Sequence, residues 1–488
     1  MPDSRRPIRV LLAVFLATAV VSGAGRPGPA PAAPGQGTAP SWALAIDKVF
    51  SAWDRPDSPG CAVGLFKDGR IVYEKGFGSA DLEHGVAITP QTMFYAGSVS
   101  KQFTAMAVAL AIQKGLFGAD DDVRKFVPEL PDYGTPVTVR HLIHHTSGLR
   151  DINTLMSIAG RRDEDAFDND AVLRILARQK ALNFKPGDEH LYSNSGYAVL
   201  ALIVERTSRM SFADFAAANI FAPLGMTETH FHTDLGRLVP NRGYAYDRPT
   251  AGPVRLNTPA NERAGAGGLF TNVRDLLAWD ENFYTGRVGG KELIARLETP
   301  GRLNSGAALV YAWGLQVGTY RGLPIVEHSG ALGGYRAQII RFRGQHVTAA
   351  LLCNAGSIDP SSLSRRMADV YLKDAFTEPV PAPRPPAAAA AVASAPRAQY
   401  TPDELAAFAG TYESTELETT YRVTRDGDAL RLTRGVQRAQ LALRPSEPRD
   451  EFSVSGATLR FSRDAGGRVS GITVDAGRIR GVVFTRVR

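Results

Sequence analysis

Ser98 and Lys101 stand three residues apart in the tetrad Ser98-Val99-Ser100-Lys101, just before an apolar segment with helical periodicity. Residues with this spacing at a helix start face the same side, so the ammonium can reach the hydroxyl. The positive end of the helix dipole and burial both disfavour the protonated form of such a lysine. A neutral lysine can take the proton of a serine hydroxyl as the oxygen attacks a carbonyl. The tetrad predicts a nucleophile with its base, and its alternative is an ordinary helix start.

A second segment with chemical potential is Tyr192-Ser193-Asn194. A tyrosine next to a lysine can share the transfer of a proton, and an asparagine amide can bind the lysine and a substrate amide at once. Tyr192 is therefore a candidate second base and Asn194 a candidate substrate ligand. The alternative is an ordinary loop, because many loops contain Tyr-x-Asn.

The third segment, His328-Ser329-Gly330, ends a short apolar strand that begins at Ile325. Glycine at a strand end lets a substrate lie close against the backbone. The N–H of the following Ala331 could join the N–H of Ser98 in an oxyanion hole. The alternative is a simple transition from strand to turn.

The elements around these motifs predict an α+β fold in which an antiparallel sheet is built from both ends of one domain. Strand patterns occupy 61–66, 71–73, 325–328, 337–341 and 347–352. Helical patterns begin near residue 41 and recur at 104–116, 171–179, 196–207 and 273–284. Strands thus open and close the domain, and helices fill its middle. Asn272 suits the N-terminal cap of the last helix.

Taken in order, the three motifs resemble those of the serine β-lactamase and penicillin-binding protein family, closest to its class C-like branch of esterases and D-peptidases. The resemblance extends from about Trp42 to Ala375. Four further stretches support it: Phe94-Tyr95-Ala96-Gly97, His145-Thr146-Ser147-Gly148-Leu149, Phe184-Lys185-Pro186-Gly187 and Gly267-Gly268-Leu269. It implies a β-lactamase/transpeptidase-like fold and no cofactor.

The resemblance implies that Ser98 is acylated, that Lys101 is the base or proton relay, and that Tyr192 later helps to activate water. Asn194 then positions the lysine and the substrate. His328 takes the place often held by a lysine, Gly330 follows it, and Ala331 gives the oxyanion donor. No Lys-Thr-Gly occurs in the chain, and His144 stands where a threonine is expected. A histidine is only partly charged near pH 7, which makes it a weaker anchor for a carboxylate.

Cys61 and Cys353 are the two cysteines, and their spacing fits no metal site. Buried free thiols are the favoured reading, with a disulfide as the alternative. If the first and last strands are antiparallel neighbours, as the resemblance implies, the two Cα atoms should lie close together in the sheet.

The two ends of the chain differ from its middle. Residues 1–24 predict an export signal, with basic Arg5, Arg6 and Arg9 before an apolar run too short to span a bilayer. Residues 25–40 predict a disordered linker, which would place the hydrolase domain at 41–377. A Pro- and Ala-rich linker at 378–398 precedes a small all-β, barrel-like domain at 399–488. Twin-arginine export is an open alternative to the general route.

Charge and motifs exclude several functions. The net charge is +7, but basic residues are mixed with acidic ones and form no basic run with interleaved aromatics, so no nucleic-acid partner is expected. Histidines cluster at His141, His144 and His145 and at His230 and His232, yet neither group has a ligand set, and no metal is expected. Gly-x-Ser-x-Gly, His-Glu-x-x-His and phosphate-loop motifs are missing from the sequence.

These observations predict an exported serine hydrolase, periplasmic or secreted, with no stable membrane span after signal cleavage. Its substrate would be a small molecule or peptide: an ester, a D-amino-acid amide or peptide, or a β-lactam. Ester and D-peptide chemistry rank first, because the cation that usually grips a β-lactam carboxylate is missing. The alternatives are a non-hydrolytic penicillin-binding-like module and a cell-wall or partner-binding role for the all-β domain.

Overall fold

The structure, a computed structural model, describes residues 39–162, 165–248, 252–381, 398–437 and 439–487. The predicted signal at 1–24 lies outside these ranges, as does most of both predicted linkers. The described residues from Ser41 onward belong to one compact unit. No helix in the described ranges has the length and apolar character needed to cross a bilayer.

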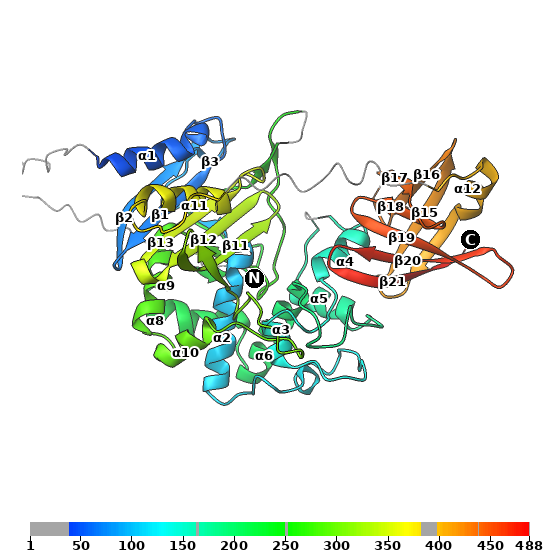
Figure 1. The fold of residues 1–488 in the computed structure, drawn as a ribbon, viewed down its shortest axis with the longest axis horizontal. Coiled ribbons are helices and arrows are strands. Elements are labelled where there is room, and N and C mark those ends of the chain that lie inside the picture. Colours follow the sequence, from blue (N-terminus) through cyan, green and yellow to red (C-terminus); the bar gives the residue numbers. More distant parts are fainter. Residues whose placement is uncertain (1–38, 163–164, 249–251, 382–397, 438, 488) are drawn as a thin grey trace, which may run out of the picture. The chain divides into compact units, whose positions relative to one another are not determined.

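A six-stranded antiparallel sheet joins the two ends of the first domain, as the strand patterns predict (Figure 1). Its order is β10-β11-β12-β13-β1-β2. The strands are β1 (Cys61–Lys67), β2 (Arg70–Phe77), β10 (Gln316–Tyr320), β11 (Leu323–Leu332), β12 (Tyr335–Phe342) and β13 (Val347–Cys353). Short pairs and triplets are formed by β3 (Ser79–Asp81), β4 (Val86–Ala87), β5 (Phe94–Tyr95), β6 (His230–Phe231), β7 (Tyr246–Asp247), β8 (Arg255–Leu256) and β9 (Leu269–Thr271).

Cys61 on β1 lies directly opposite Cys353 on β13, which confirms that the two residues are neighbours in the sheet. Their Cα atoms are 4.0 Å apart and their sulfurs form a disulfide. The favoured reading of two free thiols is therefore wrong. Both residues are fully buried, and the antiparallel register brings their side chains to the same face, where they can bond.

Side chains alternate between the two faces of the sheet, and each face has its own helical cover. Val63 and Leu65 of β1 pack under α1 (Ser41–Phe50) and α11 (Pro360–Tyr371). Ala62 and Phe66 of the same strand point to the larger helical core on the other face. Figure 1 shows α1 and α11 on one face and α2 and α9 (Val273–Thr285) on the other.

The central helix α2 (Ser100–Gln113) is buried along almost its whole length and packs against α6 (Asn194–Ser208). A single turn of 3₁₀ helix, Gly97–Val99, leads into it. The other helices are α3 (Val139–Ile143), α4 (Ile152–Ile158), α5 (Asn169–Leu176), α7 (Phe212–Ala216), α8 (Ala222–Leu224), α10 (Gly290–Leu297) and α12 (Pro402–Phe408). Asn272 caps α9, as its sequence position predicts.

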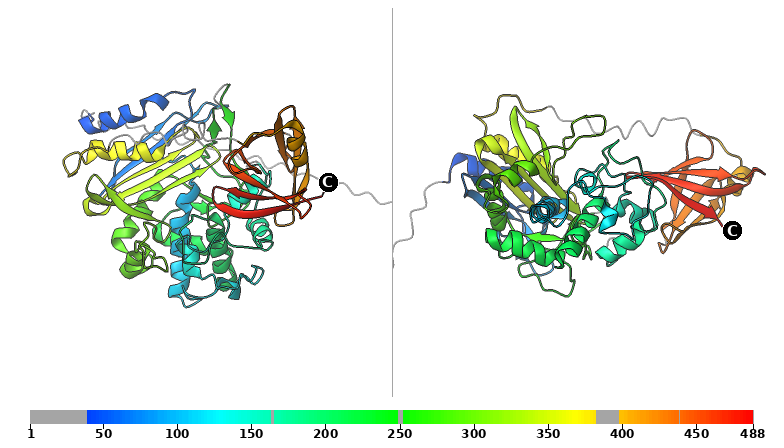
Figure 2. Two further views of the ribbon diagram at one scale, coloured as in Figure 1. Left: turned by 45° about the vertical axis from the view of Figure 1, so that its right-hand side comes forward. Right: turned by 90° about the horizontal axis from the view of Figure 1, so that it is seen from below.

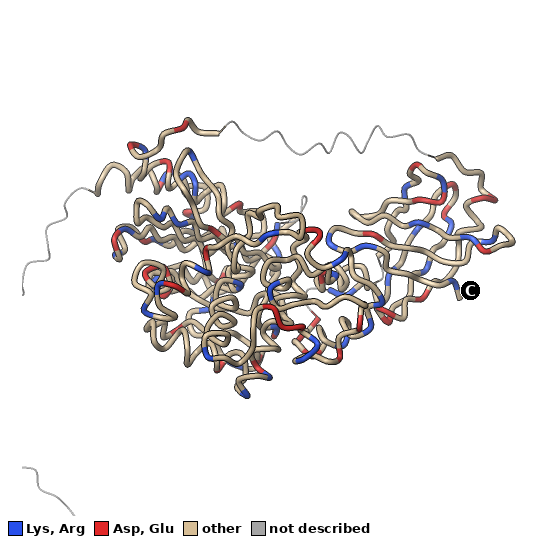
Figure 3. Tube along the Cα trace, turned by 60° about the horizontal axis from the view of Figure 1, so that its bottom comes forward, with Lys and Arg blue, Asp and Glu red and all other residues tan. Residues whose placement is uncertain are grey.

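The C-terminal strands close into an eight-stranded antiparallel barrel, β14 to β21 in chain order (Figure 2). This confirms the predicted all-β architecture. The strands are β14 (Gly410–Ser414), β15 (Thr419–Asp426), β16 (Ala429–Arg434), β17 (Leu441–Pro445), β18 (Glu451–Val454), β19 (Ala457–Arg463), β20 (Val469–Ala476) and β21 (Ile479–Arg486). β14 and β17 are short and weakly alternating, so the sequence pattern did not predict them. Basic and acidic residues are interspersed along the trace (Figure 3).

The barrel contacts the first domain through a buried ion pair. Arg150 Nη1 lies 2.6 Å from Glu416 Oε2, and neither side chain is more than 3% exposed. Arg150 also donates to the backbone carbonyls of Arg480 and Gly481 on the barrel. Buried charges of this kind persist only when they are paired and hydrogen-bonded, so the contact is specific.

Candidate active site

Ser98 lies in the 3₁₀ turn that leads into α2, one turn before the helix proper, and its side chain is partly accessible. The turn depends on Gly97, whose φ is +55°. A Cβ at this position would lie 2.5 Å from the backbone nitrogen of Ala331. Glycine thus supplies the left-handed conformation and the close approach that bring Ser98 against β11.

Lys101 is fully buried, and its ammonium nitrogen has three oxygen partners. Nζ lies 3.0 Å from Ser98 Oγ, 2.8 Å from Asn194 Oδ1 and 2.7 Å from the carbonyl of Ala266. Burial lowers the pKa of Lys101 well below its usual value, and the Asp151 carboxylate opposes this shift. A neutral Lys101 donates to Asn194 and Ala266 and accepts from Ser98, which is the geometry of a general base.

The Tyr192 ring lies beside the Ser98–Lys101 pair. Its ring centroid is 4.9 Å from Lys101 Nζ. Burial raises the pKa of Tyr192 well above its usual value, and a hydrogen bond with Ser98 opposes the rise. Tyr192 is therefore a neutral phenol at ordinary pH. It can pass a proton along, and Lys101, whose pKa is lowered, is better suited than Tyr192 to accept one.

Asn194, the first residue of α6, is oriented by Asp151, which the sequence motifs did not identify. Asp151 Oδ2 accepts hydrogen bonds from the backbone N–H and the side-chain Nδ2 of Asn194, at 2.7 and 2.8 Å. The Asn194 carbonyl is thereby aimed at Lys101. The only sequence signal was a charged dipeptide, Arg150-Asp151, just beyond the stretch that ends at Leu149.

Gly330 and Ala331 run along the opposite side of Ser98. A Cβ at Gly330 would lie 2.0 Å from the carbonyl oxygen of Ala96 and 3.1 Å from the nitrogen of Ser98, so only glycine fits. Ala331 and Ser98 both line a small pocket. The backbone nitrogens of Ser98 and Ala331 are thus placed to receive the oxyanion that forms when a carbonyl is attacked.

His328 lies beside the site, but it is not a cation. Burial lowers the pKa of His328 to about 3. Its Nδ1 lies 2.6 Å from the Ser329 carbonyl, and its Nε2 lies 3.0 Å from the Tyr311 hydroxyl. A carbonyl only accepts, so Nδ1 carries the hydrogen and Nε2 accepts from Tyr311. The imidazole supports Tyr311 and holds no charge for an anionic group.

The pocket at Ser98 continues into a larger cavity of about 300 Å³, and Arg263 lines both. Arg263 donates to Asn261 Oδ1 and to Asn153 Oδ1, each at 2.6 Å. These three side chains form one wall of the pocket that Ser98 opens into. No sequence motif marked them, since Asn153 lies at the start of α4 and Asn261 and Arg263 lie on a loop more than 100 residues further along the chain.

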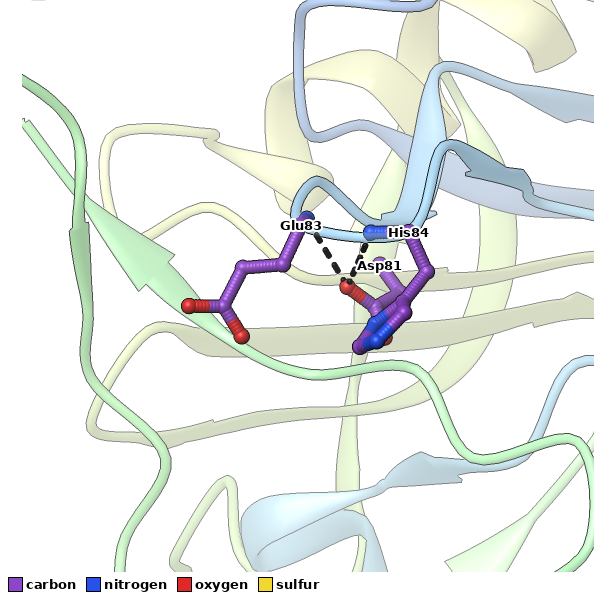
Figure 4. Close-up of side chains that lie close together, drawn as sticks. All are labelled: Asp81, Glu83 and His84. Atoms are coloured by element: carbon purple, nitrogen blue, oxygen red, sulfur yellow. Dashed lines mark hydrogen bonds and ion pairs between the residues drawn. The ribbon is translucent and has the colours of Figure 1, made fainter.

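Two of the clustered histidines, His144 and His145, pack against aromatic rings. His145, which has a φ of +57°, packs its ring 4.2 Å from that of Tyr192. His144 packs edge-on against Trp313. A set of three potential metal ligands does occur elsewhere, at Asp81, Glu83 and His84 (Figure 4). There the Asp81 carboxylate accepts from the backbone N–H groups of Glu83 and His84 and contacts the His84 ring, as in an ordinary turn.

Three comparisons place the chain among known proteins. A model of the Beta-lactamase family matches residues 46–373. Penicillin-binding protein 4* of Bacillus subtilis is 32% identical over 59% of this chain and 66% of its own length. The D-aminopeptidase of Brucella canis is 31% identical over 61% of this chain and 56% of its own length. The chain thus spans less than two thirds of these relatives.

A solved structure extends the likeness to the barrel. The octameric penicillin-binding protein homologue from Pyrococcus abyssi is 24% identical, with a TM-score of 0.60, over 91% of this chain and 99% of its own. At this identity the likeness concerns the fold.

Proposed function

This chain belongs to the beta-lactamase family, and from that premise we propose that it is a serine amidase or peptidase that forms an acyl-enzyme on Ser98. Its substrates are amides or peptides of D-amino acids, with simple esters as easier alternatives. One observation carries the proposal. A fully buried Lys101 places its nitrogen 3.0 Å from Ser98 Oγ while two further acceptors fix it.

In the acylation step, Ser98 Oγ attacks the substrate carbonyl and its proton passes to Lys101. The negative charge on the former carbonyl oxygen is stabilised by the N–H groups of Ser98 and Ala331. When the C–N bond breaks, the leaving amine takes a proton from Tyr192. Tyr192 then takes a proton from Lys101. Water then attacks the acyl-enzyme and gives a proton to Lys101 by way of Tyr192. When the ester C–O bond breaks, Ser98 Oγ takes that proton back and the acid is released.

The substrate class rests on two supports. The relatives that match this chain include D-aminopeptidases, at 31% and 28% identity. The neutral His328 offers no cation where efficient β-lactam binders of the family place one, so we rank D-amide hydrolysis above β-lactam hydrolysis.

The test is a substrate panel with mass spectrometry of the enzyme. D-alanine p-nitroanilide, its L counterpart, p-nitrophenyl acetate and a chromogenic cephalosporin are compared for kcat/KM. We expect a higher kcat/KM for the D-alanine anilide than for the L-alanine anilide, turnover of the ester, and an acyl adduct on Ser98. Ser98→Ala should remove every signal, while Ser305→Ala, at an exposed serine, should change none. Absence of both turnover and adduct in the wild-type protein would refute the proposal and favour a non-hydrolytic binding module.

We also propose that the protein works outside the cytoplasm. A basic segment followed by an apolar run opens the sequence, and a buried disulfide joins Cys61 to Cys353. Disulfides of this kind form in oxidising compartments. Expression in a bacterium followed by fractionation and N-terminal sequencing tests this. Retention of the uncleaved chain in the cytoplasm would contradict it.

A further inference from the structure

The turn between β20 and β21 of the barrel carries Arg478 to the edge of the active site. The Arg478 guanidinium centre lies 4.6 Å from the centroid of the Tyr192 ring. Tyr192 in turn contacts Lys101 and Ser98. A cation on the C-terminal barrel therefore stands one side chain away from the nucleophile of the first domain.

The turn is anchored on both sides of Arg478. The carbonyl oxygen of Arg478 accepts a hydrogen bond from Asn183 Nδ2 at 3.0 Å, and the N–H of Arg480 donates to Asn183 Oδ1 at 2.8 Å. The Arg480 guanidinium also pairs with Glu189. Arg150 donates to the carbonyls of Arg480 and Gly481, at 3.0 and 2.9 Å. These bonds fix the position from which the Arg478 side chain extends.

The Arg478 side chain is available to a ligand. The residue is exposed, and within the described residues no carboxylate forms an ion pair with it. Asp151, the acidic group nearest to the lysine, already accepts from Asn194 and from Thr154. An exposed guanidinium against Tyr192, one side chain away from Ser98, favours a ligand that carries a carboxylate.

The first domain does not supply that cation at the expected strand. His328 is neutral and hydrogen-bonded to Tyr311 and to the Ser329 carbonyl. The other guanidinium at the pocket, Arg263, is held by Asn261 and Asn153. The positive charges around Ser98 thus come from two arginines, one of them on the barrel.

We propose that Arg478 is a specificity-determining residue that binds a carboxylate on the substrate, so that the barrel completes the active site. The preferred substrates are then D-peptides whose leaving group carries a free carboxylate, and an added ammonium in that position is disfavoured. This inference rests on the proposed function, because it names the substrate class of the same site.

The experiment compares D-alanyl-D-alanine with D-alanyl-D-alaninamide, which differ only in the carboxylate. Cleavage of the bond between the two residues is followed by mass spectrometry in the full chain, in Arg478→Ala and in Arg478→Lys. Arg468→Ala is the matched control, because it removes one exposed arginine at the opposite end of β20. The measured quantity is the ratio of kcat/KM for the acid to that for the amide.

We expect the wild-type ratio to exceed one and to fall about fivefold or more in Arg478→Ala, the size expected for a partly exposed charge-assisted hydrogen bond. Arg478→Lys should keep part of the preference, and Arg468→Ala all of it. Raising the salt concentration should lower the wild-type ratio, because exposed charges are screened.

Other outcomes separate the two proposals. Equal losses on both substrates in Arg478→Ala would mean that the arginine only supports Tyr192, and the inference would be wrong. Ester turnover and a Ser98 adduct without a preference for the acid would overturn the inference but leave the proposed function standing. No turnover of any substrate and no adduct would overturn both.

Discussion

The buried pair of Arg150 and Glu416 gives the sharpest test of how the barrel is attached. Glu416 Oε2 accepts from Arg150 Nη1 at 2.6 Å and from the backbone N–H of Lys180 at 2.8 Å. Glu416→Ala removes both bonds and leaves an arginine that is 2% exposed without its counter-charge. Breaking a buried pair in this way costs about 3–5 kcal/mol of unfolding free energy.

The magnitude can be checked against a neighbouring pair that lies in solvent. Glu418 pairs with Arg178 at 3.1 Å and is 66% exposed. Glu418→Ala should therefore cost less than about 1 kcal/mol. Replacing both members of the buried pair, as Arg150→Met with Glu416→Leu, should recover most of the loss, because no charge is left buried.

The assay is urea unfolding followed by circular dichroism and by intrinsic fluorescence, with ester hydrolysis at Ser98 in parallel. We expect Glu416→Ala to move the midpoint strongly and Glu418→Ala hardly at all. A Glu416→Ala midpoint equal to that of Glu418→Ala would refute the argument, since it would mean that the barrel does not depend on the buried pair.

Three further predictions concern the site and the sheet. Lys101→Ala should lower kcat for acylation at least about a hundredfold. In the wild-type protein, kcat/KM should rise with pH through the lowered pKa of Lys101 and then level off. A bell-shaped profile centred near the usual lysine pKa would contradict this. Replacing Cys61 and Cys353 with alanine should lower the unfolding free energy by about 2–4 kcal/mol, measured by urea unfolding, because the disulfide no longer restricts the unfolded chain. Burial lowers the pKa of His144 to about 4, so below about pH 6.5 the unfolded state binds more protons than the folded state. The stability of the folded protein should therefore fall from there towards pH 4. His144→Gln should make that fall less steep in thermal unfolding, and an unchanged slope would count against this argument.

Much of the fold follows from local pattern. The strand and helix periodicities predicted the barrel and the sheet that is built from both ends of the first domain. They could do so because burial of one face of an element leaves an alternating or helical pattern of apolar residues in the sequence. Several elements were missed, among them β10, β14, β17 and α11. β14 and β17 are short strands of a closed barrel, and their pairing with neighbours decides their conformation more than their own residues do. α11 was missed although Asp359 and Pro360 form a helix start signal, with Asp359 as the N-terminal cap.

The candidate site divides in the same way. The sequence alone singled out Ser98, Lys101, Tyr192 and Asn194, because their motifs occur in the order that the β-lactamase and penicillin-binding protein family has. The structure brings all four together. It was tertiary packing that selected Asp151, whose carboxylate reaches Asn194 from another helix start.

Protonation and charge at the site were decided by the tertiary structure as well. The presence of a histidine in a sequence does not reveal whether its ring is charged. In the structure, burial and two hydrogen bonds make the His328 ring neutral. Arg478 belongs to a turn that the sequence marks only as Ala-Gly-Arg, and its place beside Tyr192 exists because the barrel packs on the first domain. The sequence by itself determined the candidate nucleophile and its candidate base, because the three motifs occur in the order that the family has and Ser98 and Lys101 lie one helical turn apart. The surrounding charges required the fold, because they come from residues that meet only when distant segments pack together.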